Sequence, residues 1–209
     1  MGEHEDMVVL ITGAGKGRGR ILAEAFAERG AIVAANDISP INVEEVVEEI
    51  NKRGGRAKAY IEDVAKKVGA QNLIKQVEDD YGHIDILINH AAVEPHVPLM
   101  DMDEWDWHRV LDVNLTGAFL MTQSVGRVMR TSSPKGGQGA GVIINLITAK
   151  QNSDGNEAAF VASMNGLDGF TRQAAHELSP YGIRVYAVED AGDKIVERVF
   201  ALLDQKEER

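Results

Sequence analysis

The sequence predicts an α/β fold in which one doubly wound parallel sheet carries helices on both faces. Short, continuously apolar runs recur along the chain, and each is followed by a longer stretch with the periodicity of an amphipathic helix. Strands this apolar are expected to be buried on both faces, and helical connections between them give right-handed crossovers to parallel neighbours. In such folds, ligands bind at the carboxyl ends of the strands.

Six strands and six helices alternate in the predicted order. The predicted strands are Met7–Thr12, Ala31–Asn36, Ala57–Ile61, Ile84–Asn89, Val142–Ile147 and Ile183–Val188. The predicted helices are Ile21–Arg29, Ile41–Lys52, Val68–Tyr81, Asp103–Met129, Ala158–Leu178 and Asp193–Gln205. A polar loop at 132–137 contains glycine and proline, but the alternation resumes directly after it. We therefore expect residues 1–209 to form a single domain.

The composition is acidic and otherwise typical of a soluble globular protein. Lysine and arginine number 22 against 33 acidic residues, which gives a formal net charge of -11. Nucleic acids and anionic membranes repel such a surface, so neither is expected as a partner. The first six residues are acidic where a signal peptide would be basic, and no apolar run reaches membrane-spanning length. These features predict a cytoplasmic protein.

A glycine-rich turn lies between the first predicted strand and the helix after it. Its eight residues, Thr12–Gly19, include four glycines. Glycines let such a turn tighten and let its backbone approach a pyrophosphate at the helix N-terminus. Asp37 ends the second strand, 24 residues after Gly13, where its carboxylate can accept hydrogen bonds from the adenosine ribose hydroxyls. Together these features predict a dinucleotide site of the Rossmann type.

Asp37 also bears on the choice of cofactor. A carboxylate at the ribose repels the 2′-phosphate of NADP, so NAD is the expected cofactor and NADP is the less favoured one. Lys16 has the opposite influence, because a cation there could meet a 2′-phosphate, but Asp37 is expected to lie closer to the ribose. An alternative role for Asp37 is to cap the helix that follows. Ser39, directly before Pro40, suits that role better.

In these motifs and several further ones, the chain resembles the short-chain dehydrogenases/reductases from Met7 to about Val188. The turn matches the Thr-Gly-x-x-x-Gly-x-Gly signature of that family. The resemblance implies an Asp-Val pair at the adenine and an asparagine that holds the central strands together. His90 and Ala92 depart from the usual Asn-Asn-Ala-Gly motif at this point. The implied cofactor-binding residues are Gly13, Lys16, Gly17, Arg18, Gly19, Asp37, Asp63, Val64, Asn89 and Ala91.

The resemblance also locates the positions of the family's catalytic residues. The family uses a serine and a Tyr-x-x-x-Lys pair, in which the tyrosine transfers the substrate proton and the lysine lowers the pKa of the tyrosine. Phe160 and Met164 occupy the tyrosine and lysine positions here. Thr148 falls at the serine position, and Asn114 matches the asparagine that bends the long helix and anchors a proton-relay water. The last two are expected to be remnants of the catalytic site.

No displaced pair replaces the lost tyrosine and lysine in the sequence. None of the four tyrosines has a lysine four residues later, and none lies in Ala158–Leu178. The family also has a substrate-covering segment and a seventh strand after the sixth. Here the chain passes from Glu189–Gly192 almost directly into the last predicted helix. We therefore expect both the substrate lid and the seventh strand to be missing.

These observations predict an NAD-binding homologue that is catalytically impaired. We expect it to act as a non-catalytic subunit, with an active family relative as its partner, or as a dinucleotide-sensing regulator. The alternative is an NAD(P)-dependent oxidoreductase that acts on an alcohol or ketone with a substitute proton donor, such as a water held by Asn114 and Thr148. A scaffold without nucleotide binding is disfavoured by the intact turn and Asp37.

The histidines and the long helices allow two further expectations. His90, His96 and His108 lack helical ligand spacing and a flanking acid in ligand register, so no metal site is expected. In the family, the two long helices pair across a two-fold axis, and the seventh strand builds a second interface. We therefore expect a homo- or heterodimer through these helices. Their apolar series are Val110, Val113, Phe119 and Val125 on one, and Phe160, Leu167, Phe170 and Ala174 on the other.

Overall fold

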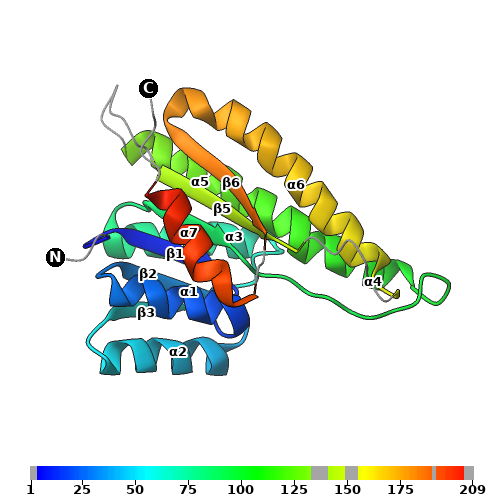
Figure 1. Cartoon of the computed structure of the whole chain (residues 1–209), viewed down its shortest axis with the longest axis horizontal. Helices are drawn as coiled ribbons and strands as arrows, with labels where there is room; N and C mark the ends of the chain where they lie inside the picture. The colour runs from blue at the N-terminus through cyan, green and yellow to red at the C-terminus, as the bar shows by residue number, and fades with distance from the viewer. Residues whose placement is uncertain (1–3, 133–140, 149–154, 190–191, 205–209) are drawn as a thin grey trace.

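The computed structural model describes residues 4–132, 141–148, 155–189 and 192–204. Their strands form one six-stranded parallel sheet with the order β3-β2-β1-β4-β5-β6 (Figure 1). The chain winds outward from β1 to β3 and then returns to place β4 on the other side of β1. This reversal creates the crevice in which doubly wound folds bind ligands. The predicted single-domain α/β fold of the Rossmann type is confirmed.

The elements lie close to their predicted positions. The strands are β1 (Val8–Thr12), β2 (Ile32–Asp37), β3 (Arg56–Ile61), β4 (Ile86–Asn89), β5 (Gly141–Ile147) and β6 (Ile183–Glu189). The helices are α1 (Gly17–Glu28), α2 (Pro40–Lys52), α3 (Lys67–Tyr81), α4 (Glu104–Leu111), α5 (Ala118–Ser132), α6 (Ala158–Leu178) and α7 (Ile195–Leu203). Helix α1 begins four residues before its predicted start, because Gly17 and Gly19 of the turn already belong to its first turn.

The long helix predicted from Asp103 to about Met129 runs from Glu104 to Ser132, and its hydrogen-bonding pattern changes part-way. A π-helical segment, Asp112–Gly117, separates α4 from α5. Asp103 lies outside the helix as its N-cap, and its carboxylate accepts a hydrogen bond from the N–H of Asp106 at 2.8 Å. Single π-helical turns of this kind occur frequently at functional sites. Asn114 lies inside the π segment and is 1% exposed.

Helices cover both faces of the sheet. Helices α1, α2 and α7 pack on one face, where Phe26, Val46 and Phe200 belong to one apolar core. Helices α3, α5 and α6 pack on the other face around residues such as Leu73 and Met121. Helices α5 and α6 run side by side along that face (Figure 1). The central strands β1 and β4 are therefore fully buried between the two helical layers, as their continuous apolar character requires, whereas most residues of the edge strand β3 are partly or fully exposed.

The chain after β6 forms helix and no strand within the residues that the structure describes. A short 3-10 turn, Gly192–Lys194, leads into α7. The ring of Phe200 packs 4.7 Å from that of Phe26, and the guanidinium of Arg29 lies 3.8 Å above the Phe200 ring. Helix α7 is thereby fixed beside α1. No helix in the described part of the chain is long and apolar enough to span a membrane.

Candidate dinucleotide-binding site

The glycine turn brings the start of α1 close to the end of β1. Gly13 and Gly17 have φ angles of 66° and 58°, in the left-handed region that favours glycine. A Cβ atom on Gly19 would overlap the carbonyl oxygen of Gly13, so no side chain fits between the two residues. Lys16 occupies the N-cap position of α1 and its side chain makes no capping hydrogen bond. The amides of the first turn can therefore serve an anionic ligand.

Asp37 lies beside this turn with a fixed orientation. Its side chain is 8% exposed, and its Oδ2 accepts a hydrogen bond from the N–H of Gly15 at 3.0 Å. Its Oδ1 accepts another from the N–H of Ser39 at 2.9 Å. Ser39 is the residue that caps α2, because its hydroxyl accepts the N–H of Asn42 at 3.5 Å. The carboxylate keeps further lone pairs that could accept hydrogen bonds from ribose hydroxyls.

A cavity of about 200 Å³ opens at the carboxyl ends of the central strands. It joins the glycine turn, the end of β2, the segment after β3 and the segment after β4. Six of the predicted cofactor residues line it: Gly13, Lys16, Asp37, Asp63, Val64 and Ala91. Gly17, Arg18, Gly19 and Asn89 do not line this cavity. The first three belong to the first turn of α1, and Asn89 faces the sheet interior.

The segment after β4 is tied to the turn by side chains. The Thr12 hydroxyl oxygen accepts hydrogen bonds from the N–H groups of His90 and Ala91, at 3.1 and 3.2 Å. The Nδ1 atom of His90 lies 3.1 Å from the carbonyl oxygen of Gly13. Asn89 donates to the Oδ1 of Asn145 at 2.8 Å, which links β4 to β5. These bonds hold together the two sides of the crevice.

Sequence reasoning did not select His90 and Arg109, which also line the cavity. His90 was noted as a departure from a motif and was considered as a metal ligand, but not as a cofactor-binding residue, although its place directly after β4 was a signal for one. Arg109 comes from α4, and no motif marks it. The Asp63 carboxylate accepts the N–H of Ala65 at 3.0 Å, so this acid shapes the segment after β3 as well as lining the cavity.

The positions of the family's tyrosine and lysine lie in an apolar cluster. Phe160 and Met164 are 4% and 5% exposed, and they pack with Val110 and Ala159. The side chains of Val93, Met102 and Trp107 cover the cluster from outside. A phenylalanine ring cannot donate a proton, and a methionine carries no charge that would lower a neighbouring pKa.

Asn114 connects three segments around this cluster. Its Oδ1 accepts the N–H of Val93 at 2.8 Å, and its Nδ2 donates to the carbonyl of Val93 and to the hydroxyl of Ser163, both at 3.0 Å. A cavity of about 10 Å³ lies beside it, with Asn89 and Met164 among its lining residues. That is room for about one water. Thr148 follows β5, is half-buried and lines neither this cavity nor the larger one.

None of the four tyrosines, all of which the structure describes, lies in the apolar cluster of Phe160. Tyr60 lies on β3, where its hydroxyl donates a hydrogen bond to Asp80 at 2.6 Å. Burial, together with this bond to a carboxylate, raises the pKa of Tyr60 well above its ordinary value. The phenol that is most strongly perturbed is therefore the one least able to ionise, and it belongs to the packing of β3 on α3.

The fold and this site together define an α/β protein built to hold a dinucleotide. The sequence matches the family model described as short chain dehydrogenase over residues 7–192. It is 35% identical over 185 residues to the (2S)-[(R)-hydroxy(phenyl)methyl]succinyl-CoA dehydrogenase subunit BbsD of Thauera aromatica, covering 88% of this chain and 72% of that one. The chain belongs to the short chain dehydrogenase family, whose members are oxidoreductases that bind NAD(P).

Solved structures of the same family have the same fold. A metagenomic short-chain oxidoreductase in complex with NADP superposes with a TM-score of 0.88 at 27% identity, covering 97% of this chain and 92% of that one. A xylitol dehydrogenase with bound NAD⁺ superposes with a TM-score of 0.82 at 32% identity, covering 90% and 70%. Similar proteins thus bind either dinucleotide, and likeness alone does not select one.

Proposed function

We propose that this chain binds NAD and is a catalytically impaired member of its family. It would act as a non-catalytic subunit of an active relative or as a dinucleotide-sensing regulator. The observation that carries the proposal is a contrast within one site. The turn and Asp37 are arranged for a dinucleotide, whereas Phe160 and Met164 form part of the apolar core.

The residues of this chain fit the dinucleotide at its adenosine and pyrophosphate ends. The turn presents backbone amides and closely packed glycines, which suit a pyrophosphate. Asp37 and Asp63 both line the cavity in which the adenosine would lie. Bound NAD would supply the hydride chemistry that is typical of the family. Around the position of Phe160, however, the described residues offer apolar side chains where a proton would have to move.

Asp37 favours NAD over NADP. Its carboxylate is held at the cavity by two backbone hydrogen bonds, so it cannot swing away from a 2′-phosphate without losing both. Lys16, the cation that could attract such a phosphate, is exposed at the N-cap of α1. A fixed, buried negative charge acts more strongly on a bound ligand than a mobile, solvated positive one.

A subunit role is supported by an outer groove between α5 and α6. The groove has a volume of about 460 Å³, and Phe119 and Phe170 meet in it edge to face with their centroids 6.0 Å apart. Phe119 is 39% exposed, which is unusual for a phenylalanine on a helix that packs on a sheet. A relative of this chain is named as a subunit of its dehydrogenase. We propose a dimer across this groove, with a second copy or with an active relative.

Isothermal titration with NADH and NADPH, followed by turnover assays on a panel of alcohols and ketones, tests the proposal. We expect NADH to bind and the purified chain to turn over no faster than cofactor in buffer. The alternative, an oxidoreductase with a water as substitute proton donor, is favoured by the one-water cavity between Asn89 and Asn114. Substantial turnover that Thr148→Ala abolishes would establish that alternative, and binding of neither NADH nor NADPH would contradict both.

A further inference from the structure

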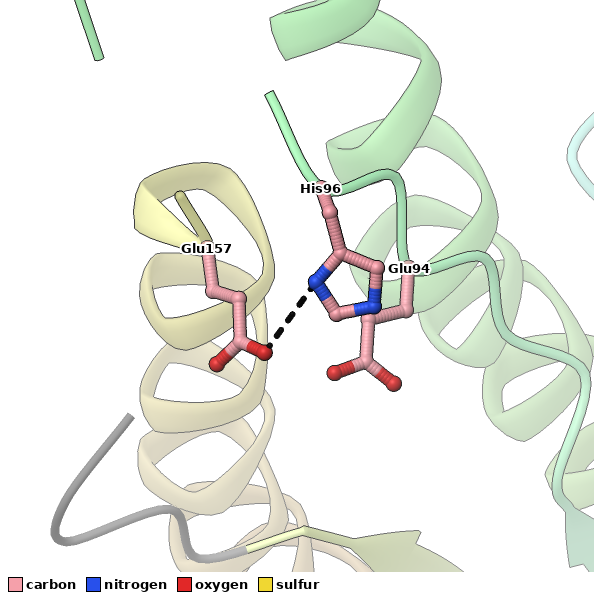
Figure 2. A group of neighbouring side chains, drawn as sticks. All are labelled: Glu94, His96 and Glu157. Carbon is pink, nitrogen blue, oxygen red and sulfur yellow. Dashed lines mark ion pairs between the residues drawn. The ribbon is translucent and has the colours of Figure 1, made fainter. Parts of the chain in front are cut away.

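We propose that Glu94, His96 and Glu157 form a binding site for a divalent transition-metal ion, for which Zn²⁺ is the best match. Glu94 and His96 come from the segment after β4, and Glu157 precedes α6. In Figure 2 the imidazole and the two carboxylates face a common space between these two segments. One ligand atom from each of the three residues lies within 4.8 Å of the others. The inference does not depend on nucleotide binding.

The distance between two of the ligand atoms already fits a metal centre. The Nδ1 atom of His96 lies 3.3 Å from the Oε1 atom of Glu157. Ligands about 2.0–2.1 Å from a tetrahedral zinc ion are separated from one another by about 3.4 Å. Glu94 is exposed, and one of its carboxylate oxygens lies within 4.8 Å of the ligand atoms of both other residues.

The ligand set selects the class of metal. Magnesium and calcium ions take oxygen ligands, and an imidazole nitrogen among three protein ligands disfavours them. Two carboxylates and one imidazole are a donor set that zinc accepts, with a water in the fourth position. A histidine binds a metal as the neutral imidazole, so the two carboxylates give the three side chains two negative charges, which a divalent cation would neutralise.

Burial distinguishes this group from an ordinary surface ion pair. Glu157 is only 6% exposed, so its carboxylate is shielded from bulk water. Buried carboxylates are stable when they are paired or coordinate a metal. His108 and Glu104 on α4 provide a comparison, since their side chains are 59% and 87% exposed, their atoms lie 3.8 Å apart and no third ligand among the described residues joins them. That pair has the spacing and exposure of an ordinary ion pair on a solvated helix surface.

The fold holds two of the ligands in place without the metal. Val93, directly before Glu94, is fixed by two backbone hydrogen bonds to the Asn114 amide. The carbonyl of Glu157 accepts the first hydrogen bond of α6, from the N–H of Val161 at 2.9 Å. A metal ion would therefore join the post-β4 segment to the start of α6, at the edge of the apolar cluster around Phe160. It would keep that segment closed over the cluster.

No metal site was predicted from the sequence, because the histidines were judged by their spacing to each other and to flanking acids. His96 has an acid two residues before it, but Glu157 comes from a different part of the chain. Only the fold brings them together. The other two histidines considered, His90 and His108, do not belong to the group of described residues that could hold an ion.

Titration of the full, tag-free chain with ZnCl₂ after removal of metal by a chelator tests the site. We expect one Zn²⁺ per chain, and His96→Gln or Glu94→Gln should each weaken the affinity at least about tenfold. Both side chains are exposed, so these variants should keep the fold, which circular dichroism checks. His108→Gln is the matched control and should bind as the wild type does.

Three results would overturn the site. They are no saturable binding of Zn²⁺ by the wild type, unchanged affinity in His96→Gln, and an equal loss in His108→Gln. A parallel titration with MgCl₂ should show binding at least about a hundredfold weaker, and equal affinity would overturn the assignment to a transition metal. Because none of these titrations contains NADH, failure of the metal site is distinguishable from failure of the proposed function.

Discussion

The carboxylate of Asp37 accepts a hydrogen bond from the backbone N–H of Gly15 at 3.0 Å, so the acid that ends β2 and the turn that follows β1 are joined directly. A Cβ atom on Gly15 would lie 2.8 Å from the same carboxylate oxygen, so glycine is needed for this approach. The negative charge is thereby fixed at the wall of the cavity. Its effect on a cofactor should be correspondingly specific.

Asp37→Asn should reduce the preference for NAD. The wild type should bind NADH more tightly than NADPH, and removal of the charge should improve NADPH binding relative to NADH about tenfold, or ~1.4 kcal/mol. The asparagine oxygen can accept only one of the two backbone hydrogen bonds, so the melting temperature should also fall. Isothermal titration with both cofactors measures the preference.

Lys16→Gln is the control for this experiment, because it removes a charge from the same cavity without touching Asp37. It should leave the preference for NADH unchanged. Equal or tighter binding of NADPH by the wild type would contradict the prediction and make Lys16 the residue that decides the cofactor.

Gly19→Ala should disrupt the turn. The new Cβ would overlap the Gly13 carbonyl oxygen and lie 2.7 Å from Nδ1 of His90, so the backbone must shift. We expect a loss of about 1–3 kcal/mol in the free energy of unfolding and markedly weaker NADH binding. Urea unfolding and titration measure the two effects.

Gly169→Ala is a matched glycine control on another helix. A methyl group added to Gly169 in α6 would meet no described atom within 4 Å, so alanine should be neutral or stabilise by about 0.5–1 kcal/mol. If Gly19→Ala and Gly169→Ala changed stability and NADH binding alike, the close packing of Gly19 on Gly13 could not be the reason that the turn needs a glycine.

The fold could be predicted from the sequence because its signals are local. Continuous apolar runs, glycine stops and amphipathic stretches each concern a few neighbouring residues, and a parallel sheet follows from their alternation. The π segment around Asn114 could not be predicted in the same way. A π-helical turn changes the hydrogen bonding of a few residues inside a helix that otherwise continues, and the apolar runs and glycine stops that mark the other elements do not mark it.

The candidate site was predictable only in part, because its residues converge from separate segments. Motifs placed Asp37, Asp63 and Ala91 at strand ends, and parallel strands bring such ends to one edge. The sequence did not show toward which neighbour each helical side chain points. Val110 and Leu167 were considered for a subunit interface, but both are buried inside this chain. Apolar periodicity does not distinguish a face against the sheet from a face against a partner.

Restoring the family's catalytic pair should cost stability and recover little activity. Met164→Lys places a charge at a position that is 5% exposed among apolar side chains, and Phe160→Tyr adds a hydroxyl in the same cluster. We expect each change to lower the free energy of unfolding, by about 1–3 kcal/mol for an unsatisfied hydroxyl and by more for the lysine. The double variant should show at most traces of turnover.

Chemical unfolding and turnover assays with NADH check both parts of this prediction. Full stability together with substantial turnover would mean that the cluster is an accessible active site and that only two side chains separate this chain from catalysis.

Phe119→Asp should abolish dimerisation. Phe119 is the more exposed partner of the phenylalanine pair in the outer groove, where it meets Phe170, and a carboxylate there would have to be buried against the partner's apolar surface. Light scattering on the purified chain should show a dimer for the wild type and a monomer for the variant. Trp105→Asp, which removes an aromatic ring that is 68% exposed on α4 outside the groove, should remain dimeric. A wild-type monomer at high micromolar concentration would refute the self-dimer, and a stable homotetramer would reveal a second interface that does not require a seventh strand.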